Sequence, residues 1–279
     1  MAEQPPDRSR EAVVVTGAGG MGMAVARRIG SGRTLFLADA SPGRLHLAVQ
    51  ELRDEGYAAR GVATDVSDRD AVDRLAREAA GAGRVAAVVH TAGLSAVQAP
   101  ARRILEVDLL GTAHVVDAFE AVATPGTALV CVASMAGHVA SLTGEEETAL
   151  ATVPARDLLT TGAVLAVGDS PTRAYVVSKR GNQLRAEAAA LAWSRRGARV
   201  NSVSPGVVAT AMAKAEAEGP SGARMRAMQE ASGAGRSGTP AEIAGAVAFL
   251  VGPEARYING TDLLVDGGQA AWLRHHRPH

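Results

Sequence analysis

The 279-residue chain has few aromatic residues, a single cysteine and no excess of charge of either sign. Lys+Arg and Asp+Glu both number 29, which excludes the strongly basic surface of a dedicated nucleic-acid-binding domain. Cys131 alone cannot form an internal disulfide, which favours a reducing compartment. No run approaches the ~18 consecutive apolar residues of a membrane span. We therefore expect a cytoplasmic protein with neither nucleic acid nor a membrane as partner.

Hydrophobic residues make up 47% of the chain, which is enough apolar material for a sizeable core. Residues 1–10 contain two prolines and no apolar run, so we expect a disordered extension and neither a signal nor a transit peptide. Residues 271–279 include a basic, histidine-containing stretch that we interpret as a solvated tail. Residues 11–270 are expected to form one domain.

Short apolar runs alternate with segments of helical periodicity along this domain. The runs that predict strands are Ala12–Thr16, Thr34–Ala38, Arg60–Thr64, Val85–His90, Ala128–Ala133, Val200–Ser204 and Asp262–Val265. The segments that predict helices are Met21–Ile29, Pro42–Glu55, Asp68–Ala80, Ala101–Ala121, Thr172–Ser194 and Ala241–Val251. This alternation is typical of βαβ units. It predicts an α/β fold, a single doubly wound Rossmann-type domain with about seven mostly parallel strands flanked by helices.

Two segments interrupt the alternation. Residues 141–170 separate a strand from the helix that should follow it, and we expect an inserted helical segment there. Residues 211–238 are small, polar and rich in glycine, and we expect a mobile lid over a bound substrate. Long connections of this kind in compact domains commonly serve as lids or binding loops.

A glycine-rich turn follows the first strand and opens the first helix. Gly17, Gly19 and Gly22 satisfy G-x-G-x-x-G, with Gly20 and Met21 between them. Such a turn lets the backbone approach a pyrophosphate, and the helix N-terminus offers N–H groups to its charge. Glycine turns also end strands for purely structural reasons, but the strand before and the helix after this one favour a dinucleotide site.

Asp39 ends the second predicted strand, 22 residues after Gly17. A carboxylate there can accept hydrogen bonds from ribose hydroxyls and would repel a 2′-phosphate, so it favours NAD over NADP. The alternative is a turn or N-cap aspartate, with Arg44 on a solvated helix face. Asp65 and Val66, after the third strand, could contact adenine, although Asp65 could also cap the next helix.

Tyr175 and Lys179 are four residues apart on a predicted helix and share one face. At about 4 Å and an effective dielectric near 20, the ammonium could stabilise a phenolate by roughly 4 kcal/mol and lower the phenol pKa by up to ~3 units before desolvation. The pair could therefore exchange a proton with an alcohol. Taken alone, Y-x-x-x-K also occurs by chance in many helices.

Taken together, the motifs resemble the classical short-chain dehydrogenase/reductase family from about Val13 to Gly268. These motifs include the glycine turn, the pair of Tyr175 and Lys179, and Ser134. The others are Thr91-Ala92-Gly93, Pro205-Gly206 with Thr210, and Asp266-Gly267-Gly268. The resemblance implies that Tyr175 is the acid/base, that Lys179 tunes it and holds the nicotinamide ribose, and that Ser134 polarises the substrate oxygen. It also implies that Thr210 and the backbone near Val208 contact the carboxamide.

The chain departs from the family pattern at four places. The glycine turn is one residue shorter than usual, and His90-Thr91 replaces the usual paired asparagines, which puts their bracing contacts in doubt. Asp108 replaces an asparagine of the proton relay, and we carry it as a candidate catalytic residue.

The fourth departure is the separation of 41 residues between Ser134 and Tyr175. This longer spacing resembles the bacterial 3α-hydroxysteroid dehydrogenase/carbonyl reductase branch. Ser141 and Ser170 lie in the same connection and are alternative candidates for the role of Ser134. The position of Ser134 at the end of a strand favours Ser134.

The histidines and Cys131 show no metal-ligand spacing such as H-E-x-x-H, so no metal is expected. We expect His46 and His114 at the surface or the boundary of their helices. His138 could line the pocket, but we favour a solvated loop position for it.

The sequence therefore predicts an NAD(H)-dependent oxidoreductase that interconverts a secondary alcohol and a ketone on a bulky, largely apolar small molecule such as a hydroxysteroid or cyclic ketone. Two alternatives stay open, a redox-neutral isomerase or cyclase and a non-catalytic dinucleotide-binding protein. The family resemblance implies a homodimer or homotetramer.

Overall fold

The computed structural model describes residues 11–219 and 222–275, so the predicted extension at 1–10 lies outside the described part. One sheet of seven parallel strands runs through the domain in the order β3-β2-β1-β4-β5-β6-β7. The strands are β1 (Glu11–Thr16), β2 (Thr34–Asp39), β3 (Ala58–Ala63), β4 (Arg84–His90), β5 (Ala128–Val132), β6 (Arg199–Pro205) and β7 (Asp262–Val265). The predicted fold class and the predicted strands are confirmed.

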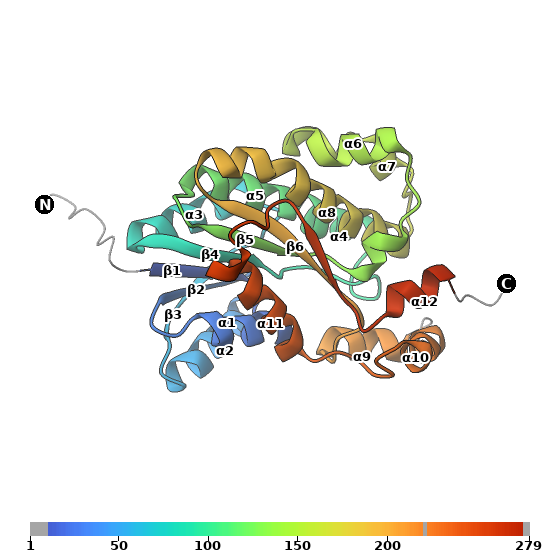
Figure 1. Ribbon diagram of the computed structural model, residues 1–279, viewed down its shortest axis with the longest axis horizontal. Helices are drawn as coiled ribbons and strands as arrows, with labels where there is room; N and C mark the ends of the chain where they lie inside the picture. The colour runs from blue at the N-terminus through green and yellow to red at the C-terminus, as the bar shows by residue number, and fades with distance from the viewer. Residues whose placement is uncertain (1–10, 220–221, 276–279) are drawn as a thin grey trace, which may run out of the picture.

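Helices cover both faces of the sheet, as Figure 1 shows. One face carries α1 (Gly20–Ile29), α2 (Pro42–Asp54) and α11 (Pro240–Val251). The other carries α3 (Arg69–Ala82), α5 (Gly111–Val122) and α8 (Pro171–Arg195). The inner strands β1, β2, β4, β5 and β6 are buried on both faces, which is why they appear in the sequence as continuous apolar runs, whereas the edge strands β3 and β7 are partly exposed.

The helix predicted for Ala101–Ala121 is wrong as a single α-helix. The structure divides it into α4 (Ala101–Ile104), a π-helical segment η1 (Leu105–Leu110) and α5. A π-turn carries an extra residue per turn and often marks a functional site. Here it contains Asp108.

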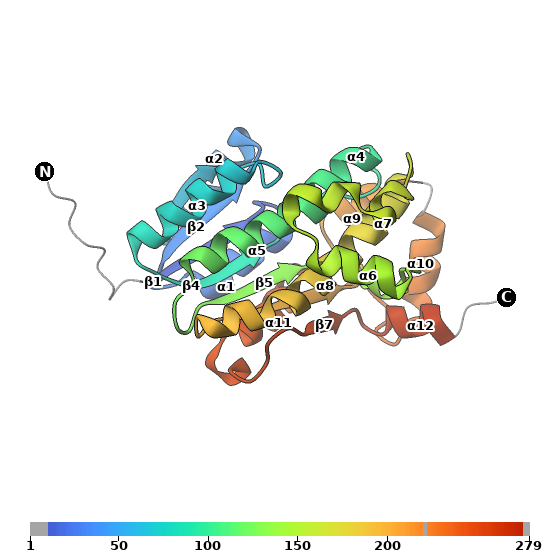
Figure 2. The ribbon, with the colours of Figure 1, turned by 90° about the horizontal axis from the view of Figure 1, so that it is seen from above.

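The insertion at 141–170 is helical, as predicted. It contains α6 (Gly144–Thr152), a 3-10 segment η3 (Ala155–Thr160) and α7 (Gly162–Leu165), and it follows the 3-10 segment η2 (Met135–Val139). Figure 2 shows α6 and α7 outside the sheet and its helices, with α6 in contact with α8. Arg185 on α8 is buried and donates hydrogen bonds to the carbonyls of Leu150 and Val153, at the end of α6. The insertion is therefore attached to α8 through a buried cation.

The segment 211–238 is more regular than predicted. It forms α9 (Ala211–Glu218) and α10 (Gly222–Ala231), because its alanines support helix between the glycines. Residues 271–275, predicted as the start of a basic tail, belong to α12 (Gln269–His275), where Arg274 and His275 are exposed. Leu273 of α12 is buried against Met135 and Met228, and residues 276–279 lie outside the described part. Figures 1 and 2 show α9, α10 and α12 gathered at one end of the molecule.

Across residues 11–219 and 222–275, no helix combines the length and the apolar character that crossing a membrane would require. The remaining element is the short 3-10 segment η4 (Pro253–Ala255) before β7.

Candidate active site

The predicted site residues follow the carboxyl ends of β1, β4, β5 and β6, which meet at one edge of the sheet because all strands are parallel. Ligands of doubly wound sheets bind outside this edge, where the strand order reverses. The reversal lies between β1 and β4, beside the glycine-rich turn.

The glycine-rich turn is shaped for a close approach of backbone and ligand. Gly17 has φ +88°, and a Cβ there would lie 2.8 Å from the backbone nitrogen of Ala92. A Cβ on Gly22 would overlap the carbonyl oxygen of Gly17. The Cβ position of Gly19 meets no atom within 4 Å, and Gly19 begins α1 without a side-chain cap. No side chain caps the first N–H groups of α1, which leaves them available to the pyrophosphate of a dinucleotide.

The Asp39 carboxylate is buried at the end of β2 and ties the glycine turn to the next helix. It accepts hydrogen bonds from the backbone N–H groups of Ala18 at 2.9 Å and Ser41 at 2.8 Å. Arg44 lies on the exposed face of α2, as predicted, and its guanidinium lies 3.4 Å from Oδ2 of Asp39. An anion and a cation therefore stand together at the predicted ribose position.

Polar groups of Asp65 and Val66 both interact with other side chains of the same chain. The Asp65 carboxylate accepts from Ser67 and pairs with Arg103 at 2.5 Å, and Asp68 rather than Asp65 caps α3. The Val66 carbonyl accepts from His114, which is buried and so lies neither at the surface nor at the boundary, where it was predicted. His46 is exposed, as predicted.

His90 and Thr91 brace the sheet edge where the family pattern has asparagines. The His90 ring lies 2.7 Å from the Thr16 hydroxyl and 3.1 Å from the Thr112 hydroxyl. Thr91 donates to the Thr16 carbonyl at 2.7 Å. Burial lowers the pKa of His90 to about 3, so the ring is neutral. The sequence left in doubt whether the bracing contacts of the usual asparagines are present. In the structure, His90 and Thr91 make bracing contacts at this position instead.

Ser134, Tyr175 and Lys179 meet at this edge. Ser134 follows β5, and its hydroxyl accepts a hydrogen bond from the Ala136 N–H at 3.2 Å and lowers the pKa of the neighbouring Tyr175 phenol. The Lys179 ammonium lies 5.4 Å from the centre of the Tyr175 ring and donates to the Val132 carbonyl at 3.5 Å. The two alternative serines lie elsewhere, because Ser170 caps α8 and Ser141 is exposed. The structure thus brings together three side chains scattered along the sequence.

Asp108 joins this group from the π-helical segment. Its Oδ2 lies 3.1 Å from the Lys179 ammonium, and its Oδ1 accepts from the Leu94 backbone N–H at 2.7 Å. A Cβ on Gly93 would lie 3.2 Å from both Oδ2 of Asp108 and Nζ of Lys179, so a side chain there would crowd this pair. Ala92 is half-buried beside it.

The net electrostatics differ from the predicted lowering of the phenol pKa. Burial raises the pKa of Tyr175 above its usual value, and the charges of Asp108 and Glu216 add to this. Lys179 and the Ser134 hydroxyl act in the opposite direction but do not prevail. Burial lowers the pKa of Lys179, but the Asp108 carboxylate and the Tyr175 phenol raise it, for a net increase. The predicted lowering by Lys179 is present, but the desolvation of the buried phenol outweighs it.

Gln183 is a positioning residue that the sequence reasoning missed. It donates to the Ser134 carbonyl at 3.3 Å and to the Ser204 hydroxyl at 2.8 Å. Its position, four residues after Lys179 on the same helix face, was the available signal. His138 was also misplaced, because it is partly buried and lies 2.6 Å from Oδ2 of Asp262, not in solvent.

The residues after β6 close the site from the side of α9. Gly206 donates to the Val265 carbonyl, and Val208 pairs with Gly238 in a β-bridge. Thr210 caps α9, and its Cγ2 lies 3.5 Å from the Cβ position of Gly20. Pro205 ends β6. These contacts hold the start of α9 over the glycine turn.

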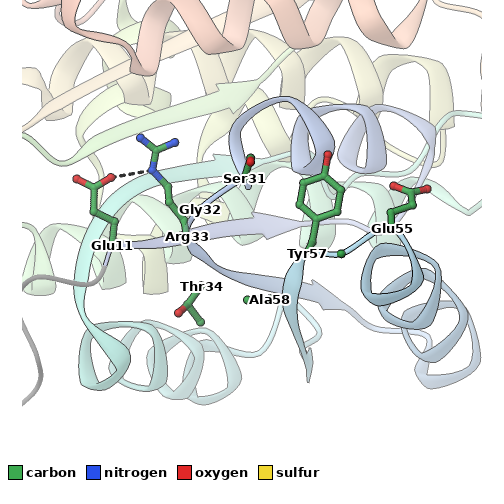
Figure 3. A pocket seen from close by; sticks show the side chains of 9 residues that line it. Glu11, Ser31, Gly32, Arg33, Thr34, Glu55, Tyr57 and Ala58 are labelled. Carbon is green, nitrogen blue, oxygen red and sulfur yellow. Dashed lines mark hydrogen bonds and ion pairs between the residues drawn. The ribbon is translucent and has the colours of Figure 1, made fainter.

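A separate pocket lies at the opposite edge, where β1, β2 and β3 begin (Figure 3). Its lining includes Glu11, Arg33 and Tyr57, and Arg33 pairs with Glu11 at 2.7 Å. None of the predicted site residues lies there. Within the described residues, no cluster of three or more His, Cys, Asp or Glu could hold a metal ion.

Two family models match the chain, one in each half. Residues 11–145 match the model described as short chain dehydrogenase, and residues 157–270 match the model described as Enoyl-(Acyl carrier protein) reductase. The first half carries the glycine turn and Ser134, and the second carries Tyr175 and Lys179.

Individual proteins cover nearly the whole chain. The short-chain dehydrogenase/reductase bsc3 of Alternaria brassicicola is 34% identical over 95% of this chain and 97% of its own. The cis-4-hydroxycyclohexanecarboxylate dehydrogenase of Sinomonas cyclohexanicum is 32% identical over 94% and 97%. A crystal structure of an actinorhodin polyketide ketoreductase variant with NADPH matches with a TM-score of 0.74, 26% identity and coverage of 95% and 99%. The chain therefore belongs to the short-chain dehydrogenase/reductase family, as an oxidoreductase whose fold implies a nicotinamide dinucleotide cofactor.

Proposed function

We propose that this chain is an NAD-dependent alcohol dehydrogenase that interconverts a secondary alcohol and a ketone on a cyclic, largely apolar substrate, in the hydroxysteroid or cyclic-ketone class. The observation that carries the proposal is the meeting of Ser134, Tyr175 and Lys179 beside the glycine turn. The name of the cyclohexane relative supports a ring substrate.

When bound, the nicotinamide accepts or donates the hydride. The side chains of the chain would handle the proton. In the oxidative direction, Tyr175 takes the hydroxyl proton of the substrate while Ser134 holds the same oxygen by a hydrogen bond. Lys179, kept as an ammonium by Asp108, stabilises the phenolate that must form first. In the reductive direction, the protonated phenol returns the proton to the carbonyl oxygen.

The cofactor would lie along the carboxyl edge, from Asp39 to Thr210. Gly17, Gly19, Gly20, Met21 and Gly22 would hold the pyrophosphate. Asp39 would accept hydrogen bonds from the ribose hydroxyls, which favours NAD, although the neighbouring Arg44 offsets part of its charge. Val66, Thr91, Ala92, Gly93, Pro205, Gly206 and Val208 would line the remaining edge, while Asp65 would contribute only through its backbone because Arg103 and Ser67 occupy its carboxylate.

The test is the formation of reduced nicotinamide by the purified chain with cyclohexanol, cyclohexane-1,4-diol, 4-hydroxycyclohexanecarboxylate and a hydroxysteroid, with NAD and NADP compared at equal concentration. We expect turnover with NAD on at least one neutral ring alcohol. Product formed without a change in the nicotinamide would indicate the isomerase or cyclase alternative. Cofactor binding without turnover of any alcohol or ketone would indicate the non-catalytic alternative.

We also propose that the chain forms a homodimer or homotetramer in the cytoplasm. The insertion lies on α8, so any assembly through that helix must include α6 and α7. Light scattering after size exclusion measures the number of copies, and a monomer would contradict the proposal.

A further inference from the structure

The position of the Ser134 hydroxyl depends on the short segment η2 that follows it. The hydroxyl accepts a hydrogen bond from the Ala136 N–H at 3.2 Å, and the Ser134 carbonyl accepts from the Gly137 N–H at 3.0 Å. Both donors belong to η2, so a displacement of η2 also displaces the hydroxyl. Because the hydroxyl accepts from the backbone, its own proton stays available for the oxygen of a substrate.

The side-chain amide of Gln183 supports the start of η2. Its Nε2 donates to the Ser134 carbonyl at 3.3 Å, and its Oε1 accepts from the Arg180 guanidinium at 3.1 Å. A Cβ on Gly137 would lie 2.7 Å from the same Nε2, so a side chain at 137 would displace the amide. Gln183 is buried, and η2 therefore packs directly against an amide whose orientation is fixed.

A carboxylate at the start of β7 connects this amide to the end of η2. Oδ1 of Asp262 accepts from the hydroxyls of Ser204 at 2.9 Å and Ser202 at 2.5 Å. The Ser204 hydroxyl in turn accepts from Nε2 of Gln183 at 2.8 Å. Oδ2 of Asp262 lies 2.6 Å from Nε2 of His138 in η2. Because a carboxylate only accepts hydrogen bonds, the His138 ring carries its proton on Nε2.

The segment η2 is thus held at both ends by one polar network. Gln183 binds the carbonyl at its start, Asp262 binds the imidazole at its end, and the Ser204 hydroxyl joins the two. The network has little contact with water, since Ser204 and Gln183 are buried and the Asp262 side chain is 14% exposed. Hydrogen bonds in such surroundings restrict the positions of the groups that they join.

We propose that His138 and Asp262 are positioning residues for Ser134, which act through Ser204, Gln183 and the backbone of η2. The inference rests on the proposed function, because it is the role of Ser134 at the reacting oxygen that makes its position matter. Neither His138 nor Asp262 touches the reacting atoms. Loss of their contact should therefore slow the chemical step and leave cofactor binding unchanged.

Two variants of His138 separate the hydrogen bond from the packing of the side chain. His138→Leu removes the donor, whereas His138→Gln keeps an N–H donor on a side chain of similar reach. Asn259→Ala is the control for a general loss of stability, because Asn259 makes its hydrogen bonds with Val200 and Ala190, away from η2.

Two measurements are made on each variant. The first gives kcat, KM and the dissociation constant for NAD, with the alcohol that the wild type oxidises fastest among the four tested above. The second is amide hydrogen exchange of the peptide 134–140 followed by mass spectrometry, which reports on η2 without any substrate. Melting temperatures show that each variant is folded.

We expect His138→Leu to lower kcat by about tenfold, with KM and the dissociation constant for NAD changed by less than about threefold. Exchange of the peptide 134–140 should become faster by about tenfold. His138→Gln should restore most of both properties. Asn259→Ala should lower the melting temperature but keep kcat within about twofold of the wild type.

A double-mutant cycle tests the connection through Asp262. His138→Leu combined with Gln183→Leu should lower kcat hardly more than either change alone, because both changes release the same segment. Losses that multiply would show that His138 and Gln183 act independently, which would overturn the network.

The remaining outcomes separate this inference from the proposed function. Wild-type turnover together with unchanged kcat and unchanged exchange in His138→Leu would overturn the inference alone. A loss of kcat in Asn259→Ala equal to that in His138→Leu would also overturn it, because the effect would then follow stability. A wild type that oxidises none of the four alcohols would contradict the proposed function and, with it, the role assigned to Ser134.

Discussion

The Lys179 ammonium lies 3.1 Å from Oδ2 of Asp108, and both side chains are buried. Asparagine, the residue expected here from the family pattern, would leave the ammonium charge uncompensated. The aspartate keeps Lys179 protonated and at the same time weakens its effect on the Tyr175 phenol. Burial and this carboxylate together therefore set the proton balance of the site.

Asp108→Asn should shift the pH dependence of alcohol oxidation to lower pH. The carboxylate contributes to the raised pKa of Tyr175, so its removal lowers that pKa. Oxidation requires the phenolate and rises as pH passes the phenol pKa, so the rise should begin at lower pH. The amide oxygen can still accept from the Leu94 N–H. Profiles of kcat/KM against pH measure this, and an unmoved or alkaline-shifted rise would contradict it.

His90 should make the fold sensitive to acid. Its pKa is about 3 in the fold and about 6.5 when unfolded, so between these values the unfolded state binds the extra proton. Stability should fall by up to about 1.4 kcal/mol for each pH unit lost below about pH 6. Urea unfolding of His90→Asn should show a correspondingly smaller loss than the wild type. The exposed His46→Asn is the control, and equal losses in all three proteins would contradict the expectation.

Asp39→Ser should relax the choice of cofactor. Loss of the carboxylate removes the repulsion of a 2′-phosphate and leaves Arg44 free to pair with it. We expect the ratio of NADP affinity to NAD affinity to rise about 10- to 100-fold, measured by titration calorimetry. Arg44→Ala in the Asp39→Ser background should reverse part of this gain. A wild type that binds NADP more tightly than NAD would contradict the assignment.

Arg185→Met should loosen the insertion. The guanidinium is buried and satisfies the carbonyls of Leu150 and Val153, so its loss leaves them without their donor. We expect the free energy of unfolding to fall by about 2–3 kcal/mol and cleavage within residues 141–170 to become faster in limited proteolysis. Arg156→Met is the control, because the Arg156 side chain is 81% exposed. Cleavage rates that match the wild type would show that the insertion does not depend on Arg185.

The sheet could be predicted from the sequence because its five inner strands are buried on both faces and appear as apolar runs, whereas the mostly exposed edge strand β3 appears as a weaker run. The meeting of Ser134 and Tyr175 followed from strand ends and helix spacing together with the family resemblance. The helical insertion was also predictable in outline, since its acidic start at Glu145–Glu147 lies in the first turn of α6.

Other features depend on tertiary contacts that no local pattern encodes. The π-turn that presents Asp108, and the pairing of Asp108 with Lys179, arise only when α4 and α8 pack together. The direction of the Tyr175 pKa shift depends on burial and on two carboxylates distant in sequence. The burial of His114 and Leu273 similarly requires partners from other elements.

The central claim is that Tyr175 transfers the proton while a bound nicotinamide exchanges the hydride. The most direct measurement compares wild type and Tyr175→Phe for reduced-nicotinamide formation and for NAD affinity on the same samples. The account predicts that turnover falls by about 1000-fold, whereas the dissociation constant for NAD changes by less than about threefold. Turnover of Tyr175→Phe at the wild-type rate would contradict the account.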